Sequence, residues 1–362
     1  MERILATYRI TAPEAESRVR AQALATEQSV EMPLDAIGEQ RILDEIVAQV
    51  LDIRPHGDYF EVDLGIAPET TGNEPAQLMN MLFGNCSMQP EVEFVGVRFP
   101  AGYEQAFPGP RFGIDGIRRI THAYGRPLTS TALKPQGSSV EHLAGLARTF
   151  ALAGIDVIKD DHGIANQVSA PFEKRVPAVQ KAIMEANRET GGHAVYAPTF
   201  SGGSIALSAQ ARVAKDCGVR MALIAPMLVG IPAFVEAQVE LDIPVMAHPA
   251  FVGGARIAPP VLLGKLFRLF GADATIFPNH GGRFTYSRDV CTAIADRARE
   301  PWASVKPALP VPAGGMTLER VDEMVRDYGQ DVMLLIGGGL LAAGDHLLER
   351  SREFVRKVAR LN

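Results

Sequence analysis

The stretch GIDVIKDDHG, residues Gly154–Gly163, places a lysine, two aspartates and a histidine directly behind branched apolar residues. A short apolar run bounded by turn residues is typical of a strand that is buried on both faces. Because side chains alternate along a strand, Lys159 and Asp161 are expected to point one way and Asp160 the other. The stretch therefore predicts a buried strand with ionisable groups at its carboxyl end.

Similar apolar runs recur along the chain, each followed by glycine, proline or polar residues. Together with the opening stretch there are eight, centred near residues 131, 158, 196, 223, 246, 277, 310 and 334. Amphipathic stretches such as SVEHLAGLARTFALAG separate them and are long enough for crossover helices. Eight buried strands that alternate with helices predict a parallel (β/α)8 TIM barrel. A doubly wound open sheet is disfavoured, since no GxGxxG follows the first strand.

The first part of the chain lacks this regularity. RILATYRIT, RILDEIVAQVLDIRPHGDYFEVDLGIAP and VEFVGVRFP mix strand-like and helical patterns, which suits a small α+β, ferredoxin-like domain. FPGPRFG has the prolines and glycines of a connecting segment. We therefore expect an α+β domain over residues 1–115 and a catalytic barrel over residues 116–362.

The composition is that of an ordinary globular protein. The chain has 362 residues, of which 47% are hydrophobic and 22% charged, and its formal net charge is −6. This mild acidity argues against nucleic acid and anionic membranes as partners. The charged start predicts no signal peptide, and no apolar run approaches the ~20 residues of a membrane span, so we expect a cytoplasmic protein. Cys86, Cys217 and Cys291 show no CxxC spacing, which indicates neither a disulfide framework nor a zinc cluster.

The predicted strands carry their polar residues at the carboxyl ends, where barrel active sites lie. The first, second, fifth and sixth strands end, in turn, in Lys134, in Lys159 to His162, in His248, and in Asn279 with His280. The seventh and eighth strands end in the glycines Gly314, Gly315, Gly337, Gly338 and Gly339. Backbone N–H groups free of side chains bind phosphate well near helix starts, so these glycines predict a phosphate site. Tight packing between strand and helix is the alternative reason for glycine.

The residue types alone leave three roles open for Lys159. It can form a buried ion pair with Asp161. It can be a Schiff-base nucleophile, as in barrel aldolases. In the third role Asp161 holds a hard cation such as Mg2+, and lysine becomes a ligand only after CO2 converts its amine to a carbamate.

Several motifs, in this order, resemble those of the RuBisCO superfamily over most of the chain. They are LATEQSVEMP, LFGNCSM, YGRPLTSTALKPQG, GIDVIKDDH, MAHPAF, FPNHGG, LPVPAGG and LIGGGLL. The resemblance implies that Lys159 is carbamylated and holds Mg2+ with Asp161 and the residue after it, His162. It also implies that Glu27 and Asn85 reach into the neighbouring subunit's site, and hence a homodimer with shared active sites or a higher oligomer.

Because it departs from the superfamily pattern at several positions, the chain resembles a RuBisCO-like protein rather than a carboxylase. His162 stands where the usual pattern has a metal-binding glutamate, so it would bind Mg2+ weakly, favour another metal or hold a water. The loop GGRFTYSRD lacks the lysine that guides CO2 onto the enediolate. Gln136, Ala132, Pro249 and Ala313 replace a lysine, a threonine, an arginine and a serine, respectively. Lost contacts to one phosphate predict a substrate with a single phosphate.

Further roles follow for the polar groups at the strand ends. Lys134 is expected to act as general acid or base if burial and a nearby cation lower its pKa, and a plain counter-ion role is the alternative. His248 and His280 would bind substrate oxygens or shuttle a proton. Asn279 and Arg283 are weaker candidates for substrate binding, with Arg283 able to pair with phosphate through two hydrogen bonds.

Together these features predict an enzyme that forms a metal-stabilised enolate from a phosphorylated keto sugar. EQSVEMP and KDDHG look closer to enzymes of apiose catabolism, so the first prediction is a 3-oxo-isoapionate-4-phosphate decarboxylase, a carbon–carbon lyase, or a hydrolase that cleaves the same substrate. The alternative is an enolase or isomerase acting on a methylthio-ribulose or diketo-methylthiopentyl phosphate in methionine salvage. Alternative functions from other classes are a Schiff-base aldolase and a catalytically inactive barrel that binds a sugar phosphate or has a regulatory role.

Overall fold

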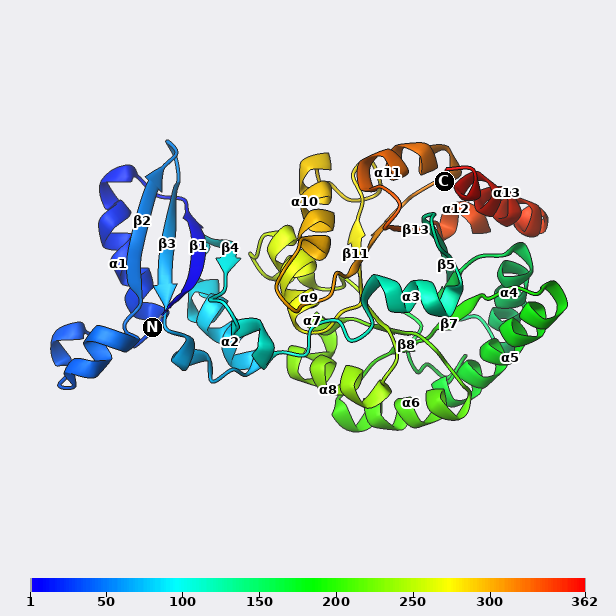
Figure 1. Cartoon of the computed structure of the whole chain (residues 1–362), viewed down its shortest axis with the longest axis horizontal. Helices are drawn as coiled ribbons and strands as arrows, with labels where there is room; N and C mark the ends of the chain where they lie inside the picture. The colour runs from blue at the N-terminus through cyan, green and yellow to red at the C-terminus, as the bar shows by residue number, and fades with distance from the viewer. Residues whose placement is uncertain (1, 362) are drawn as a thin grey trace. The chain divides into compact units, whose positions relative to one another are not determined.

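The computed structural model describes residues 2–361, has a mixed α/β fold and divides into two compact units (Figure 1). The first unit runs to Pro108 and takes in the later segment Phe251–Leu262, and the second comprises Gly109–Ala250 and the chain from Leu263 onward. The boundary after residue 115 stays a prediction of where the catalytic domain begins. Among the described residues, no helix is long and apolar enough to cross a membrane.

The first unit is a ferredoxin-like α+β domain, as predicted. Its elements are β1 (Ile4–Ile10), α1 (Ser17–Glu27), β2 (Gln49–Pro55), β3 (Phe60–Ile66), α2 (Pro75–Phe83) and β4 (Val92–Arg98). The strands form an antiparallel sheet in the order β2-β3-β1-β4. In β1 every second side chain is buried, which is the pattern of a strand with one face against a core.

The segment Phe251–Leu262 extends this unit at β4. Phe94 donates its backbone N–H to the Arg256 carbonyl at 2.9 Å and accepts the N–H of Ala258 at 2.8 Å. The Arg256 guanidinium also donates to two backbone carbonyls of the turn that precedes β4. A segment from far downstream in the chain therefore completes the edge of the N-terminal sheet.

The second unit is the predicted parallel barrel. Its strands are β5 (Leu128–Leu133), β6 (Val157–Asp160), β7 (Val195–Ala197), β8 (Thr199–Phe200), β9 (Ala222–Ile224), β10 (Val245–Ala247), β11 (Ala274–Pro278), β12 (Leu309–Ala313) and β13 (Met333–Leu335). Two runs of parallel neighbours, β13-β5-β6-β7 and β8-β9-β10-β11-β12, make up the wall. β7 and β8 are parts of one strand interrupted at Pro198, which has no N–H for the ladder. Since β12 also lies beside β13, eight strands close the barrel.

Helices surround the strands (Figure 1). They are α3 (Gly113–Thr121), α4 (Val140–Ala153), α5 (Phe172–Thr190), α6 (Ser204–Asp216), α7 (Pro226–Val229), α8 (Ile231–Leu241), α9 (Phe267–Leu269), α10 (Arg288–Arg299), α11 (Val321–Tyr328), α12 (Gly338–Leu341) and α13 (Leu347–Ala359). Strand residues such as Val157, Leu223 and Val311 form a buried cluster with Ile114 and Ile117 of α3. Each such side chain contributes roughly 1.5–3 kcal/mol on burial, so the filled interior is the main source of stability.

Asp273 joins three elements at the end of the barrel opposite the candidate site. Asp273 directly precedes β11 and is 1% exposed. One carboxylate oxygen accepts the backbone N–H groups of Phe112 at 2.8 Å and Gly113 at 2.6 Å. The other accepts the N–H of Val245 at 2.9 Å. A single carboxylate thus connects the starts of α3, β10 and β11.

Replacing Asp273 by alanine should destabilise the protein by at least about 3 kcal/mol, because it leaves three buried N–H groups without an acceptor. Chemical denaturation measures this change. The matched control is Asp216→Ala at an exposed position of α6, which should stay within about 0.5 kcal/mol of the parent protein. Equal stability of the two variants would contradict this account of Asp273.

Candidate active site

The register between β5 and β6 brings Lys134 and Asp161 together. Leu133 of β5 lies opposite Asp160 of β6 across the parallel ladder. The residues that follow them, Lys134 and Asp161, therefore leave the two strands side by side. Lys134 Nζ is 2.6 Å from Asp161 Oδ1. The two side chains therefore form a short charge-assisted hydrogen bond at the barrel mouth.

Lys159 is the buried cation of this site. It is 3% exposed, its ladder neighbour is Ala132, and its Nζ donates to the Asp160 carbonyl at 3.0 Å. Burial, aided by the charge of Lys134, lowers the pKa of Lys159 to about 8 against the opposing effect of Asp161. A large fraction of the amine is therefore neutral, and hence nucleophilic, near pH 8.

The buried ion pair that the sequence allows between Lys159 and Asp161 does not form. Among residues 2–361 no ion pair joins these side chains, and Asp161 pairs with Lys134. His162 Nδ1 lies 3.5 Å from the same Asp161 oxygen. Burial alone would raise the pKa of Asp161, but His162, Lys134 and Lys159 together hold it well below its usual range. Asp161 is therefore a carboxylate at physiological pH.

His248 follows β10 and stacks on His162, with ring centroids 4.2 Å apart and planes 14° from parallel. Its Nδ1 accepts the backbone N–H of Ala250 at 3.1 Å. Burial, followed by the charge of Lys159, lowers the pKa of His248 to about 2. A neutral imidazole that accepts a hydrogen bond at Nδ1 carries its proton on Nε2. His248 is therefore a neutral donor beside Lys159.

The glycines after β13 lie next to Lys134. A Cβ on Gly337 would be 3.8 Å from Lys134 Cε, whereas a Cβ on Gly338 would meet no atom within 4 Å. A Cβ on Gly339 would approach the Met316 carbonyl to 2.9 Å, so close packing also requires glycine there. Gly338 is the open position of the three.

The glycines after β12 are covered by the loop that follows β11. Gly314 and Gly315 have φ values of +90° and +97°, a region that strongly favours glycine. Arg283 donates its backbone N–H to the Gly314 carbonyl at 2.7 Å, and its guanidinium lies 5.7 Å from the Phe284 ring centroid. This pair of glycines is therefore used in packing, and the phosphate-binding roles of both glycine groups stay predictions.

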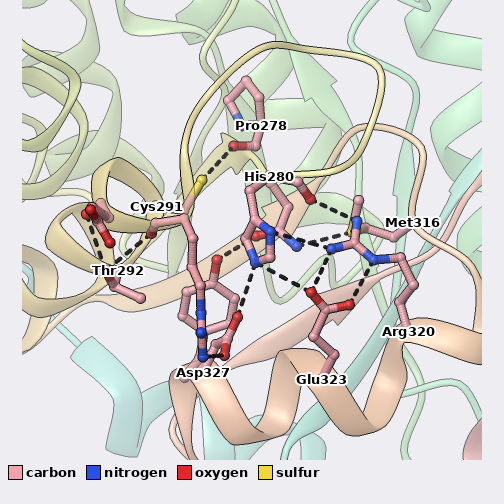
Figure 2. A network of polar contacts seen from close by, with 12 residues as sticks. Pro278, His280, Cys291, Thr292, Met316, Arg320, Glu323 and Asp327 are labelled. Carbon is pink, nitrogen blue, oxygen red and sulfur yellow. Dashed lines mark hydrogen bonds and ion pairs between the residues drawn. The ribbon is translucent and has the colours of Figure 1, made fainter.

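His280 lies in a separate polar network with α11 (Figure 2). Its Nε2 is 2.9 Å from Asp327, whose buried carboxylate also pairs with Arg288. Arg320 donates to the His280 carbonyl at 2.6 Å, lies 3.5 Å from Nδ1 and pairs with Glu323. His280, Glu323 and Asp327 are close enough to hold a metal ion, but two arginines already neutralise the carboxylates.

Both nitrogens of the His280 ring thus face protein groups. Asn279 is equally enclosed, because it is fully buried, accepts from the Tyr328 hydroxyl and donates to Met316 Sδ at 3.2 Å. Among the described residues, no hydrogen bond or ion pair joins His280, Asn279 or Arg283 to Lys159. Their roles in catalysis and substrate binding stay predictions.

Glu27 and Asn85 lie together in the first unit. Asn85 Nδ2 donates to Glu27 Oε1 at 2.9 Å, which joins the end of α1 to the turn after α2. Glu27 and Asn85, for which the resemblance implies a shared role at the neighbouring subunit's site, are therefore in direct contact, and that role stays a prediction.

Sequence reasoning missed the arginines that organise these strand ends. Arg175 pairs with Asp160 behind Lys159, and Arg320 binds the His280 carbonyl. One signal was present, because Arg175 lies on the face of α5 that buries Phe172, Val176 and Val179. A charged residue on an apolar helix face requires a buried partner.

The family described as "Ribulose bisphosphate carboxylase large chain, catalytic domain" matches residues 113–250. The chain is 51% identical to "Ribulose bisphosphate carboxylase-like protein 1" of Rhodopseudomonas palustris, over 99% of this chain and 98% of that protein. It is 49% identical to "5-methylthioribulose-1-phosphate isomerase" of Rhodospirillum rubrum, over 99% of this chain and 96% of that protein. Its fold matches the crystal structure of a RuBisCO-like protein from Rhodopseudomonas palustris with a TM-score of 0.93, 48% identity and coverage of 99% and 98% of the two chains.

The predicted decarboxylase or hydrolase of 3-oxo-isoapionate 4-phosphate is wrong in view of these relatives, because a relative this similar over its whole length is named an isomerase. The carbon–carbon lyase assignment falls with it. The reason for the error is chemical. Loss of CO2 from a β-keto acid and isomerisation of a ketose both need a stabilised enolate, so the residues that stabilise it do not distinguish the two reactions.

The lowered pKa of Lys159 gives a test of CO2 capture. Only the neutral amine reacts with CO2, so the initial rate of carbamate formation on Lys159 at fixed CO2 should rise with pH and reach half its maximum near pH 8. Alkylation with triethyloxonium followed by mass spectrometry traps and locates the carbamate. The exposed Lys181 is the internal control and should acquire no comparable label. An unlabelled Lys159 at pH 9 would contradict the prediction.

Proposed function

Because the chain belongs to the RuBisCO-like proteins, we propose that it is an isomerase of a phosphorylated methylthio-ketose, 5-methylthioribulose 1-phosphate or a close analogue. The observation that carries this proposal is the 49% identity, over nearly the full length of both chains, to the isomerase of Rhodospirillum rubrum. The barrel-mouth groups support it, since they provide a neutral donor, an exchangeable proton and a carboxylate in one place.

Isomerisation of a ketose moves one hydrogen from a carbon beside the carbonyl to another carbon. The electron pair left by the departing proton resides in an enediolate until a proton returns to the other carbon. The hydroxyl that becomes the new carbonyl loses its proton and the former carbonyl oxygen gains one, so atoms and charge balance without an oxidant or a second substrate. Lys134 holds or gives up a proton at Nζ, and its bond to Asp161 fixes the amine at the barrel mouth. His248 donates from Nε2 to a substrate oxygen and remains neutral while doing so.

The residues around Lys159 fit a divalent cation held partly by a lysine carbamate. Ala132 presents only a methyl group across the ladder. Asp161 Oδ2 faces Gly163, where even a Cβ would stay 3.6 Å away, so this oxygen is accessible on that side. Carbamylated Lys159, Asp161 and His162 would be the ligands. The carbamate and carboxylate oxygens suit Mg2+ or Mn2+, whereas the imidazole suits a transition metal better than Mg2+. When bound, the cation supplies Lewis-acid polarisation of the substrate carbonyl.

We further propose a homodimer with shared sites, in which Glu27 and Asn85 serve the partner's barrel. Large apolar side chains in the segments that follow β6, β8, β9 and β11 support a covered barrel face. Val168 and Phe284 on loops, and Ile205 and Leu228 in α6 and α7, are 97%, 51%, 90% and 60% exposed, respectively. Such clustered exposure is typical of a surface buried in an assembly. The single phosphate would lie at the glycines after β13, beside Lys134.

Purified protein with Mg2+ or Mn2+ and bicarbonate should convert 5-methylthioribulose 1-phosphate to an isomer of unchanged mass, as followed by 31P NMR. Lys134→Met should lower kcat by about 10²- to 10⁴-fold, the range for loss of a general acid or base. Lys181→Met, at a side chain 78% exposed on α5, is the matched control and should retain full activity. Release of CO2, or a borohydride-trapped adduct on Lys159, would contradict the proposal.

Mixing two inactive variants tests the shared site. Glu27→Gln and Asp161→Asn should each lose activity as pure dimers. After subunit exchange, half of the dimers are mixed and each contains one unaltered site, so about a quarter of the parent activity should return. No recovery despite exchange, shown by native mass spectrometry, would place Glu27 in its own chain's site or outside any site.

A further inference from the structure

Arg175 is a buried cation whose contacts converge on the loop that carries Asp161 and His162. The residue lies on α5 and is 0% exposed. Its Nε lies 3.1 Å from Asp160 Oδ2. Its Nη1 and Nη2 donate to the carbonyls of Ala170 and Ala165 at 2.5 and 2.8 Å. One planar guanidinium thus binds the end of β6 and two points of the following loop.

Asp160 receives two further hydrogen bonds from the next strand. The Tyr196 hydroxyl donates to Oδ1 at 2.7 Å and the Thr199 backbone N–H donates to Oδ2 at 3.0 Å. The Thr199 hydroxyl also donates to the Asp161 carbonyl at 3.1 Å. Asp160 and Asp161, the two residues after Lys159, are therefore fixed from the helix side and from β7–β8.

The loop between β6 and α5 is also bonded within itself. Gln167 accepts the Ala165 N–H at 2.9 Å and donates to the Gly163 carbonyl at 2.6 Å. Asn166 accepts the N–H of Phe172 at 2.8 Å. These bonds make the loop a compact unit, and Arg175 attaches that unit to the strand.

The burial of a charged side chain at position 175 is energetically unfavourable, so the charge is expected to have a specific role. An ion pair with both side chains 0% exposed pays a large desolvation penalty, and apolar residues of similar size often give equal stability. An apolar side chain, however, has no directional contacts with a carboxylate and two carbonyls at once. The arrangement at Arg175 therefore specifies geometry more than it adds stability.

We propose that Arg175 is a positioning residue for the divalent cation: through Asp160, Ala165 and Ala170 it sets where Asp161 and His162 stand relative to Lys159. The inference rests on the proposed function, because it presumes that these three residues hold the cation. Arg175 itself does not touch the site. Residues that orient metal ligands from behind affect affinity by about 10- to 100-fold.

The matched control is Arg268, a second arginine buried to 1% exposure. It donates to the carbonyls of Lys306, Glu300 and Val305 and contacts none of the residues around Lys159. Arg175→Lys and Arg268→Lys therefore make the same chemical change in equally buried places. Thermal unfolding should show a lowered Tm for both variants.

Mn2+ titration followed by EPR, in bicarbonate and without substrate, separates positioning from stability. We expect Arg175→Lys to bind Mn2+ about 10- to 100-fold more weakly than the parent protein, and Arg268→Lys to bind within about twofold of it. Should Arg175→Lys fail to fold, Tyr196→Phe removes one donor to Asp160 at nearly constant volume, and a several-fold loss of affinity is expected. Unchanged Mn2+ affinity in a folded Arg175→Lys variant overturns the inference and leaves the proposed function intact. If Arg175→Lys does not fold, unchanged Mn2+ affinity in Tyr196→Phe has the same meaning. A parent protein that binds no Mn2+ in bicarbonate overturns the metal role in the proposed function, and the inference with it.

Discussion

The parallel register of β5 and β6 is the constraint on which the site depends. It sets Ala132 beside Lys159 and Leu133 beside Asp160, so two lysines and one reachable carboxylate meet at the barrel mouth. Asp161 bonds to Lys134, and among residues 2–361 no ion pair holds Lys159, whose burial lowers its pKa to about 8. A slip of one residue would turn every side chain of one strand to the opposite face and separate these groups. The reactivity of Lys159 is therefore a property of strand pairing as much as of its own surroundings.

The eight apolar runs and the N-terminal α+β domain could be predicted because burial on both faces of a strand leaves a direct trace in the sequence. The alternation of Lys159, Asp160 and Asp161 could be predicted for the same reason, since it needs only the period of two. The partner of Asp161 could not be predicted, because it depends on the register between two strands whose paired residues lie 27 positions apart in the chain. The substrate could not be predicted from the sequence either, because residues that stabilise an enolate serve several reactions.

The two histidines at neighbouring strand ends show how little the residue type alone determines. His248 has one nitrogen occupied by a backbone amide, a second available and a strongly lowered pKa. His280 has Nε2 next to Asp327 of α11 and Nδ1 next to Arg320, which directly precedes that helix, so it ties the loop after β11 to α11 (Figure 2). The histidine of HPA is thus a neutral ring with one backbone hydrogen bond, and the histidine of NHGG is an internal cross-link.

The segment Phe251–Leu262 makes the order of protein synthesis matter. The edge strand β4 emerges from the ribosome early, yet the residues that pair with it are translated only after five barrel strands. At synthesis rates of about 5–20 residues per second, this edge waits roughly ten to thirty seconds for its cover. During that interval the nascent chain exposes an open sheet edge, the feature that most readily recruits foreign strands. A truncated protein that begins at Gly109 would retain the twelve residues Phe251–Leu262 but lack β4, the strand with which they pair.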